Sequence, residues 1–385
     1  MKKIIYFDNA ATSWPKPDEV IAAMNRYLCG IGGSPGRSGH RLSIEAGRII
    51  LETREALAKL FGLGDPFRIV FTKNATEALN LCLRGLLKMG DHVITSSMEH
   101  NSVMRPLRAL QKEGVELSIL QCSIRGELDP DMIRPAIRPN TKALVLTHAA
   151  NVTGTILPIA RAGRIAHEHG IVLIVDAAQT AGAVPINVNE MEIDLLAFTG
   201  HKSLFGPPGT GGLYIREGLE TQIRSLIAGG TGSRSEFEEQ PDFLPDKYEA
   251  GTPNTHGLAG LGAGVSWILS RGIGTIRAHE EALTGRLLDG LKDLPEVTVH
   301  GTGDPSRQTA LVSFNIEGLM TSEVAQELEE QFAILSRPGL HCAPAAHRTI
   351  GTFPQGTVRF GFSFFNTADE IDSALAAIRK LARCR

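Results

Sequence analysis

The stretch of sequence that decides the fold runs from residue 171 to residue 179 and reads IVLIVDAAQ. Five aliphatic residues followed by an aspartate are typical of a strand that is buried on both faces and ends at a polar site. Further short apolar runs of this kind alternate with segments of helical periodicity, such as the one marked by Leu79, Leu83 and Leu86. These runs lie at residues 68–71, 91–95, 143–147 and 194–199. The alternation predicts an α/β fold with a mainly parallel sheet and right-handed crossovers.

The pattern changes after Gly264. A helical segment at residues 276–291, short strands and a closing helix at 367–381 indicate a smaller α+β domain. At 385 residues, the chain is also longer than one compact core usually allows. We therefore predict a large α/β domain over residues 15–265, and a small α+β domain over residues 266–385 together with 1–14.

The composition excludes several classes of protein. Hydrophobic residues make up 42% and charged residues 21%, as in a globular protein rather than a disordered or fibrous one. A formal net charge of -3 gives no electrostatic footprint for nucleic acid or for an acidic membrane. No apolar run is long enough to span a bilayer. The sequence therefore predicts no nucleic-acid partner and no membrane partner.

The cysteines indicate neither a disulfide framework nor a zinc site. Their number is odd, and none belongs to a C-x-x-C pair; they are Cys29, Cys82, Cys122, Cys342 and Cys384. The histidines show no H-E-x-x-H spacing either, so no metal is predicted. Reduced thiols are typical of the cytoplasm, and we expect a cytoplasmic protein.

Polar residues follow the predicted strands of the large domain. In open parallel sheets, ligands bind beyond the carboxyl ends of the strands. The residues with chemical capability gather at these ends, in the segments 72–77, 99–101, 148–151, 176–179 and 199–202. We therefore expect one functional site along this edge of the sheet.

Single features of this edge allow more than one interpretation. Asn74 and Glu77 have capping-box spacing, so the amides of Ala75 and Thr76 form either a phosphate site or an ordinary helix start. Asp176 either takes part in chemistry or caps the next helix. Lys202 could form a Schiff base, although most lysines are solvated surface charges.

Two further segments bear on the chemistry. Cys342 lies close to Arg337 and His341, which favour a reactive thiolate, although an inert buried cysteine is the alternative. The glycine-rich segment 206–213 matches the first six positions of an ATPase phosphate loop. Gly212 stands in place of the required lysine, so an ATPase is rejected.

Taken together and in this order, a set of motifs resembles the class V aminotransferase family, and within it the cysteine desulfurases and selenocysteine lyases of the SufS type. The motifs are FDNAAT (7–12), TE (76–77), EH (99–100), NVTG (151–154), DAAQ (176–179), TGHK (199–202), EAGTPN (249–254), HC (341–342) and Arg359. The resemblance extends from about Tyr6 to the C-terminus. It implies a fold-type I enzyme that uses pyridoxal 5'-phosphate and forms a homodimer.

The resemblance also implies roles in holding the cofactor. Lys202 matches the lysine that binds it covalently, and Asp176 matches the acid that pairs with its ring nitrogen. His100 matches a catalytic imidazole stacked on the ring, and Gln179 an amide facing the ring oxygen. Phosphate-contacting positions match Ala75, Thr76, Thr199, His201 and, reaching across from the partner subunit, Thr252.

The remaining implied roles concern the substrate. Asn151, which also counts among the cofactor contacts, and Arg359 match a clamp for the substrate carboxylate. Cys342 matches the nucleophile that takes sulfur. The implied reaction converts L-cysteine to L-alanine and leaves a persulfide on Cys342, with a sulfur-acceptor protein as a further partner. A selenocysteine lyase and a plain aminotransferase are the alternatives.

The chain departs from the SufS type in its cysteine loop. That type commonly shows Arg-x-Gly-His-His-Cys, whereas here Leu340 replaces the first histidine and Pro338 stiffens the loop. One imidazole fewer beside the thiol leaves the preference between sulfur and selenium open.

Overall fold

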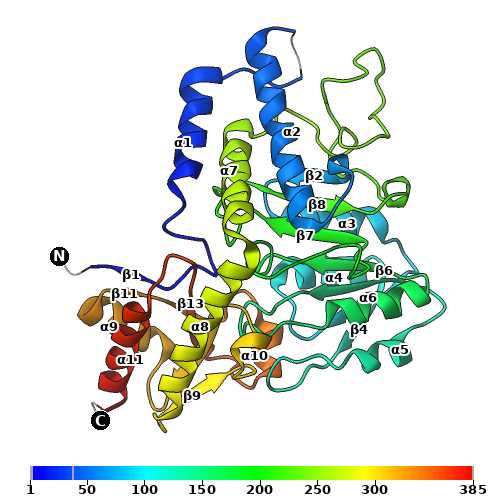
Figure 1. Cartoon of the computed structure of the whole chain (residues 1–385). Coiled ribbons are helices and arrows are strands. Elements are labelled where there is room, and N and C mark those ends of the chain that lie inside the picture. Colours follow the sequence, from blue (N-terminus) through cyan, green and yellow to red (C-terminus); the bar gives the residue numbers. More distant parts are fainter. Residues whose placement is uncertain (1–2, 37–38, 384–385) are drawn as a thin grey trace.

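The computed structural model describes residues 3–36 and 39–383 (Figure 1). Within these residues, seven strands form one sheet in the order β2-β8-β7-β6-β5-β3-β4. Neighbours from β7 to β4 run parallel, whereas β8 runs antiparallel to both β2 and β7. The bounds are β2 Ile69–Thr72, β8 Gly211–Ile215, β7 Leu195–Thr199, β6 Val172–Asp176, β5 Thr141–Thr147, β3 His92–Ser96 and β4 Glu116–Leu120. The predicted α/β class with a mainly parallel sheet is confirmed.

The aliphatic run at the centre of the sheet is buried on both faces. In β6, Leu173 and Val175 belong to one apolar cluster, and Val172 and Ile174 belong to another on the opposite face. Helices cover both clusters, so the strand positions before Asp176 must be apolar. The covering helices are α2 Arg41–Phe61, α3 Ala75–Leu86, α4 Asn101–Lys112, α6 Ile159–Glu168 and α7 Thr255–Arg271.

A second, antiparallel sheet follows in the chain. Among the described residues it has the order β12-β13-β10-β9, and α8, α9 and α11 pack on its apolar cluster. Its bounds are β9 Val297–His300, β10 Leu311–Ile316, β12 Arg337–Gly339 and β13 Thr357–Gly361. These helices are α8 Ile273–Lys292, α9 Thr321–Phe332 and α11 Ala368–Arg383, whereas α10 Pro344–Thr349 packs in a separate small cluster with Met98 and Val152. The predicted domain boundary at residue 265 falls inside α7, and the division into two domains stays a prediction.

Shorter elements complete the described chain. β1 Ile5–Tyr6 pairs in parallel with β11 Ile334–Leu335, and Figure 1 shows these two strands lying near α9. The remaining helices are α1 Asp18–Arg26, α5 Ile133–Ala136, a π-helix at Tyr27–Ile31, and 3-10 turns at Pro66–Arg68, Pro130–Met132, Leu219–Thr221 and Pro305–Arg307. In residues 3–36 and 39–383, no helix has both the length and the apolar character that crossing a membrane requires.

The segment after β1 joins the two sheets. Phe7 packs against Phe360 and Phe362 in the second core, and Asn9 donates to the Gly361 carbonyl at 3.1 Å. A few residues later, the Ser13 amide donates to the His201 carbonyl beyond β7 at 3.0 Å. Residues 7–13, the N-terminal wall, therefore contact both sheets.

A buried ion pair holds the chain that leads into α7. Arg54 on α2 is 3% exposed and pairs with Glu249, which also accepts from the Phe71 amide at the edge strand β2. The Arg54 guanidinium also lies over the Phe71 ring, 4.4 Å from its centre. The pair therefore ties α2, β2 and the segment that carries Thr252 to one another.

We predict that Arg54→Met lowers the free energy of unfolding by about 3 kcal/mol or more, because it leaves the Glu249 carboxylate buried without its cation. Arg48→Met on the same helix is the matched control. Arg48 is 72% exposed and pairs with Glu52 at 3.2 Å, so its loss should cost less than ~1 kcal/mol. Urea denaturation followed by circular dichroism measures both. Equal losses in the two variants would contradict the prediction.

Candidate active site

A cavity of about 270 Å³ lies at the carboxyl ends of β5, β6 and β7. Its lining contains all but one of the residues predicted for the site, and that one is Thr252. The lining residues are Ala10, Ala11, Asn74, Ala75, Thr76, His100, Ser102, Thr147, Asn151, Asp176, Ala178, Gln179, Thr199, His201, Lys202, Arg337, His341, Cys342 and Arg359. The structure therefore brings the predicted residues other than Thr252 together at this edge of the sheet, and their roles stay predictions.

Thr252 lies elsewhere. It borders a separate hollow of about 560 Å³, together with Lys73, Pro253 and Asn254. Within one chain, therefore, Thr252 does not reach the cavity. Its predicted role depends on a second subunit and stays a prediction.

The backbone in front of Lys202 is held by the N-terminal wall. The His201 carbonyl accepts from the Ser13 amide at 3.0 Å, the Thr12 and Ser13 hydroxyls at 3.2 Å each, and the Lys16 ammonium at 3.4 Å. Burial lowers the pKa of Lys202 to about 8, and Asp176 partly opposes this change. A fixed backbone and a lowered pKa suit an amine that must react at neutral pH.

Asp176 places a carboxylate inside the cavity at the end of β6. The side chain is 4% exposed, and its Oδ1 accepts from the Ala178 amide at 2.9 Å. Burial raises the pKa of Asp176, whereas the Ala178 hydrogen bond and the Lys202 charge oppose the rise. A buried carboxylate of this kind favours a cationic partner in the cavity.

The start of α3 offers donors for an anion. The Asn74 side chain accepts from the Glu77 amide at 2.9 Å, which confirms the predicted helix cap. The Glu77 carboxylate accepts from the Lys73 amide and not from that of Asn74, so the reciprocal half of the capping box is absent here. The amides of Ala75 and Thr76 come before the first intrahelical bonds and lie at the positive end of the helix.

Thr199, at the end of β7, adds a further donor to the cavity lining. Its hydroxyl is buried and has no hydrogen-bond partner among the described residues. An unpartnered buried hydroxyl costs free energy unless a ligand or water completes it. Together with the α3 terminus, it indicates an anion site in this part of the cavity.

Arg359 is buried between the two sheets. It lies on β13, is 1% exposed, and donates from Nη1 to the Asn151 carbonyl at 2.8 Å and from Nη2 to Asp8 Oδ1 at 3.2 Å. Burial lowers the pKa of Arg359 to about 10, and Asp8 counteracts this. Arg359 Nε and Asn151 Oδ1 are both buried and without partners among the described residues. These two atoms mark a polar position that a small ligand can fill.

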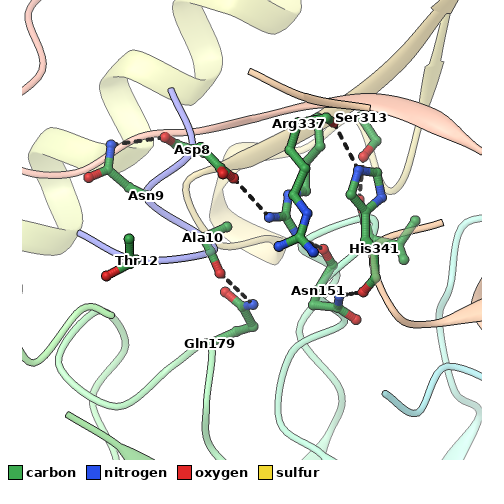
Figure 2. A network of polar contacts seen from close by, with 12 residues as sticks. Asp8, Asn9, Ala10, Thr12, Asn151, Gln179, Ser313, Arg337 and His341 are labelled. Atoms are coloured by element: carbon green, nitrogen blue, oxygen red, sulfur yellow. Dashed lines mark hydrogen bonds and ion pairs between the residues drawn. The ribbon is translucent and has the colours of Figure 1, made fainter. Parts of the chain in front are cut away.

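The side-chain amides of Gln179 and Asn151, both in the cavity lining, donate hydrogen bonds to neighbouring segments of the chain. Figure 2 shows the Gln179 side chain directed at Ala10 and the Asn151 side chain directed at His341. Gln179 Nε2 donates to the Ala10 carbonyl at 3.1 Å, and Asn151 Nδ2 donates to the His341 carbonyl at 2.7 Å. Asn151 therefore supports the cysteine loop as well as facing the cavity.

Cys342 is exposed in a loop with a constrained backbone. His341 and Cys342 both have positive φ, 49° and 58°, a region that L-residues other than glycine rarely adopt. Hydrogen bonds hold this conformation: the Asn101 amide donates to the Cys342 carbonyl at 2.9 Å, and His341 Nε2 contacts the Arg337 carbonyl at 2.9 Å. The thiol is therefore presented to the cavity by a loop with little freedom.

The other described cysteines are poorer nucleophiles or lie elsewhere. Burial raises the pKa of Cys82 to about 12 and that of Cys122 to about 11. Cys29 is exposed, but it lies in the π-helix after α1 and does not line the cavity. Cys384 lies outside the described residues.

Sequence reasoning missed some of the lining. The sequence predicts Arg337 only as a neighbour of Cys342, yet in the structure it adds a second arginine to the cavity lining. No role is predicted for Ser102 from the sequence, although it follows His100 by two positions at a helix start. In both cases, the only signal in the sequence is that the residue lies close along the chain to a predicted site residue.

Comparisons with known proteins agree with this geometry. The family model described as "Aminotransferase class-V" matches residues 5–374. A probable cysteine desulfurase of Methanothermobacter thermautotrophicus is 33% identical over 383 residues, 98% of this chain and 94% of that protein. The cysteine desulfurase of Haloferax volcanii is 32% identical over 383 residues, 97% of this chain and 88% of that protein.

Solved structures agree as well. An apo structure of the cysteine desulfurase from Thermococcus onnurineus superposes with a TM-score of 0.93 at 35% identity, covering 99% of this chain and 95% of that one. The cysteine desulfurase CsdA from Escherichia coli superposes with a TM-score of 0.86 at 30% identity, covering 98% and 94%. From the family match over nearly its whole length and from these relatives, the chain belongs to the class V aminotransferase family.

Proposed function

We propose that this protein is a cysteine desulfurase that uses pyridoxal 5'-phosphate and collects the sulfur of L-cysteine on Cys342, releasing L-alanine. One observation carries the proposal. The exposed Cys342 thiol lines the same cavity as Lys202, Asp176 and Arg359. A plain aminotransferase needs the lysine, the acid and the arginine, but it has no use for the thiol.

The residues present fit the cofactor. Ala75, Thr76, Thr199 and His201 would hold its phosphate, because the α3 terminus supplies amides and the unpartnered Thr199 hydroxyl supplies a donor. Asp176 would pair with the ring nitrogen, and His100 and Gln179 would lie against the ring. When bound, pyridoxal phosphate supplies an electron sink for the bonds that break at the substrate carbon atoms.

The substrate carboxylate would bind at Arg359. The unpartnered Nε and the Nη2 atom now shared with Asp8 form one edge of the guanidinium, which suits a bidentate carboxylate. Asn151 lies beside it through its own carbonyl contact to Nη1. This arrangement orients the substrate so that its side chain extends toward the cysteine loop.

Lys202 and Cys342 would carry out the remaining steps. With a pKa near 8, the Lys202 amine has a substantial neutral fraction and accepts the proton from the substrate α-carbon at Nζ. The Cys342 thiolate attacks the substrate sulfur, so that an S–S bond forms and the C–S bond breaks. The electron pair of that bond stays with the carbon fragment, which takes up protons and leaves as alanine.

The assembly and setting of the enzyme form part of the proposal. A homodimer would bring Thr252 of each chain to the phosphate of the other, which explains why Thr252 lies outside the cavity of its own chain. A sulfur-acceptor protein would remove the persulfide from the exposed thiol. The cytoplasmic location stays a prediction from the cysteine pattern.

Borohydride treatment of the purified enzyme is expected to fix a pyridoxyl label on Lys202, identified by peptide mapping. Lys202→Arg should lose the label and the yellow colour. Lys16→Arg is the matched control, because burial also lowers the pKa of Lys16 to about 8, yet Lys16 does not line the cavity, and its ammonium contacts the Ser13 hydroxyl and the His201 backbone carbonyl. A label on Lys16, or on any lysine other than Lys202, would contradict the assignment of Lys202 as the residue that binds the cofactor.

Arg359→Gln is expected to raise the KM for L-cysteine by about thirtyfold or more, the equivalent of ~2 kcal/mol for a buried charge pair that loses one partner. Its content of bound cofactor should stay at the wild-type level. Arg307→Gln serves as the control, because Arg307 is 60% exposed and pairs with Glu127 at 2.6 Å. Steady-state alanine formation measures both variants. An unchanged KM in Arg359→Gln would show that this arginine is structural.

Cys342→Ser is the direct test of the proposed function. The variant should keep its cofactor yet release alanine from L-cysteine only at background level, because no thiolate receives the sulfur. Mass spectrometry of the wild-type enzyme after exposure to L-cysteine should find one added sulfur atom on the Cys342 peptide. Cys29→Ser, which removes an exposed thiol away from the cavity, should behave as wild type. Wild-type alanine formation by Cys342→Ser would refute the proposal.

A further inference from the structure

Three polar side chains form a short chain of hydrogen bonds between α3 and α4. His100 is the N-cap of α4, and its Nδ1 accepts from the Ser102 amide at 3.0 Å. The Ser102 hydroxyl lies 2.9 Å from the same Nδ1 and 2.7 Å from the Thr76 hydroxyl. All three residues line the cavity. The function proposed above uses Thr76 and His100 but gives Ser102 no task.

The Ser102 amide decides the tautomer of His100. A backbone N–H can only donate, so the Nδ1 atom that it contacts must be the unprotonated nitrogen of the ring. In the neutral imidazole, the hydrogen then lies on Nε2. His100 therefore has one ring nitrogen committed to the helix start and the other free to act as a proton donor.

The hydroxyl directions follow from this tautomer. Because Nδ1 accepts, the Ser102 hydroxyl must donate to it, and its oxygen is left to accept from the Thr76 hydroxyl. The direction of donation thus runs from Thr76 through Ser102 to His100. Thr76 belongs to the first turn of α3, where the anion site lies.

We propose that Ser102 is a positioning residue for His100, whose amide and hydroxyl hold the imidazole as the neutral Nε2–H tautomer and join it to Thr76. The proposal rests on the function proposed above, in which His100 lies against the cofactor. It adds that His100 enters the reaction with its proton on Nε2. Protonation at Nδ1 is opposed by two donors that would have to turn away.

The surroundings of His100 also favour the neutral imidazole. Burial is the main cause that lowers the pKa of His100 to about 4. The positive charges of Lys202, Arg337, Arg359 and Arg105 lower it as well. The other titratable groups in the cavity lining are Asp176, His201, His341 and Cys342. All of these groups remain in a Ser102 variant, so a change in the titration of His100 there reports the lost hydroxyl.

The test compares Ser102→Ala, which removes only the hydroxyl, with Ser102→Thr, which keeps one. Ser118→Ala is the matched control, because the Ser118 hydroxyl contacts the ring of the buried His92, 2.8 Å from Nε2 and away from the cavity. Long-range proton–nitrogen NMR of histidine-labelled holoenzyme reads the tautomer and pKa of His100, and the signal missing from His100→Gln identifies it. The pH profile of alanine formation is measured on the same samples.

In the wild type, we expect the proton on Nε2. Ser102→Ala should raise the pKa of His100, and with it the acid limb of the pH profile, by roughly half to one pH unit, the effect of one neutral hydrogen bond. Its kcat should fall about fivefold at unchanged KM. Ser102→Thr and Ser118→Ala should keep the wild-type pKa.

A proton found on Nδ1, or a Ser102→Ala enzyme with the wild-type His100 pKa and pH profile, would overturn the proposal. Failure of the proposed function looks different. In that case no variant and no wild-type sample forms alanine from L-cysteine, while the NMR signals still decide the tautomer and the effect of the hydroxyl.

Discussion

The buried guanidinium of Arg359 is the group on which the geometry of the site depends. A buried cation needs compensating acceptors, and here they come from two distant segments: Asp8 of the N-terminal wall and the Asn151 carbonyl beyond β5. The arginine itself belongs to the second sheet. Its charge can be satisfied only when all three segments meet, so the same requirement that stabilises the junction also forms the cavity.

Much of this arrangement can be predicted from the sequence. The run at residues 171–176 predicts β6 to within one residue, because a strand covered by helices on both faces is apolar up to the polar residue at its end. Asp176 ends such a strand and Lys202 follows one by three residues, which makes both candidates, and the resemblance to a family then implies their roles. The direction of β8 was not predictable, since an apolar strand of five residues has the same pattern whether it runs parallel or antiparallel.

The contacts between side chains were the least predictable part. The sequence predicts that Asn151 lies at the site and makes no prediction for Ser102, and their partners are residues 341 and 76, which no local rule joins to them. Thr252 shows the opposite case, because the motif identifies it while one chain cannot bring it to the cavity. The resemblance to a family supplied what propensity and spacing could not.

The pairing of β1 with β11 has a consequence for biosynthesis. Ile5 pairs with Ile334, and Asp8 forms an ion pair with Arg359, so both partners are synthesised much later than residues 5–8. The ribosome therefore synthesises the N-terminal wall hundreds of residues before its partners. Contacts of such high sequence separation form late in folding. Until then Ile5 lacks its partner strand, and the apolar residues around Phe7 lack the core that buries them. The cavity therefore cannot be complete before Arg359 has been synthesised.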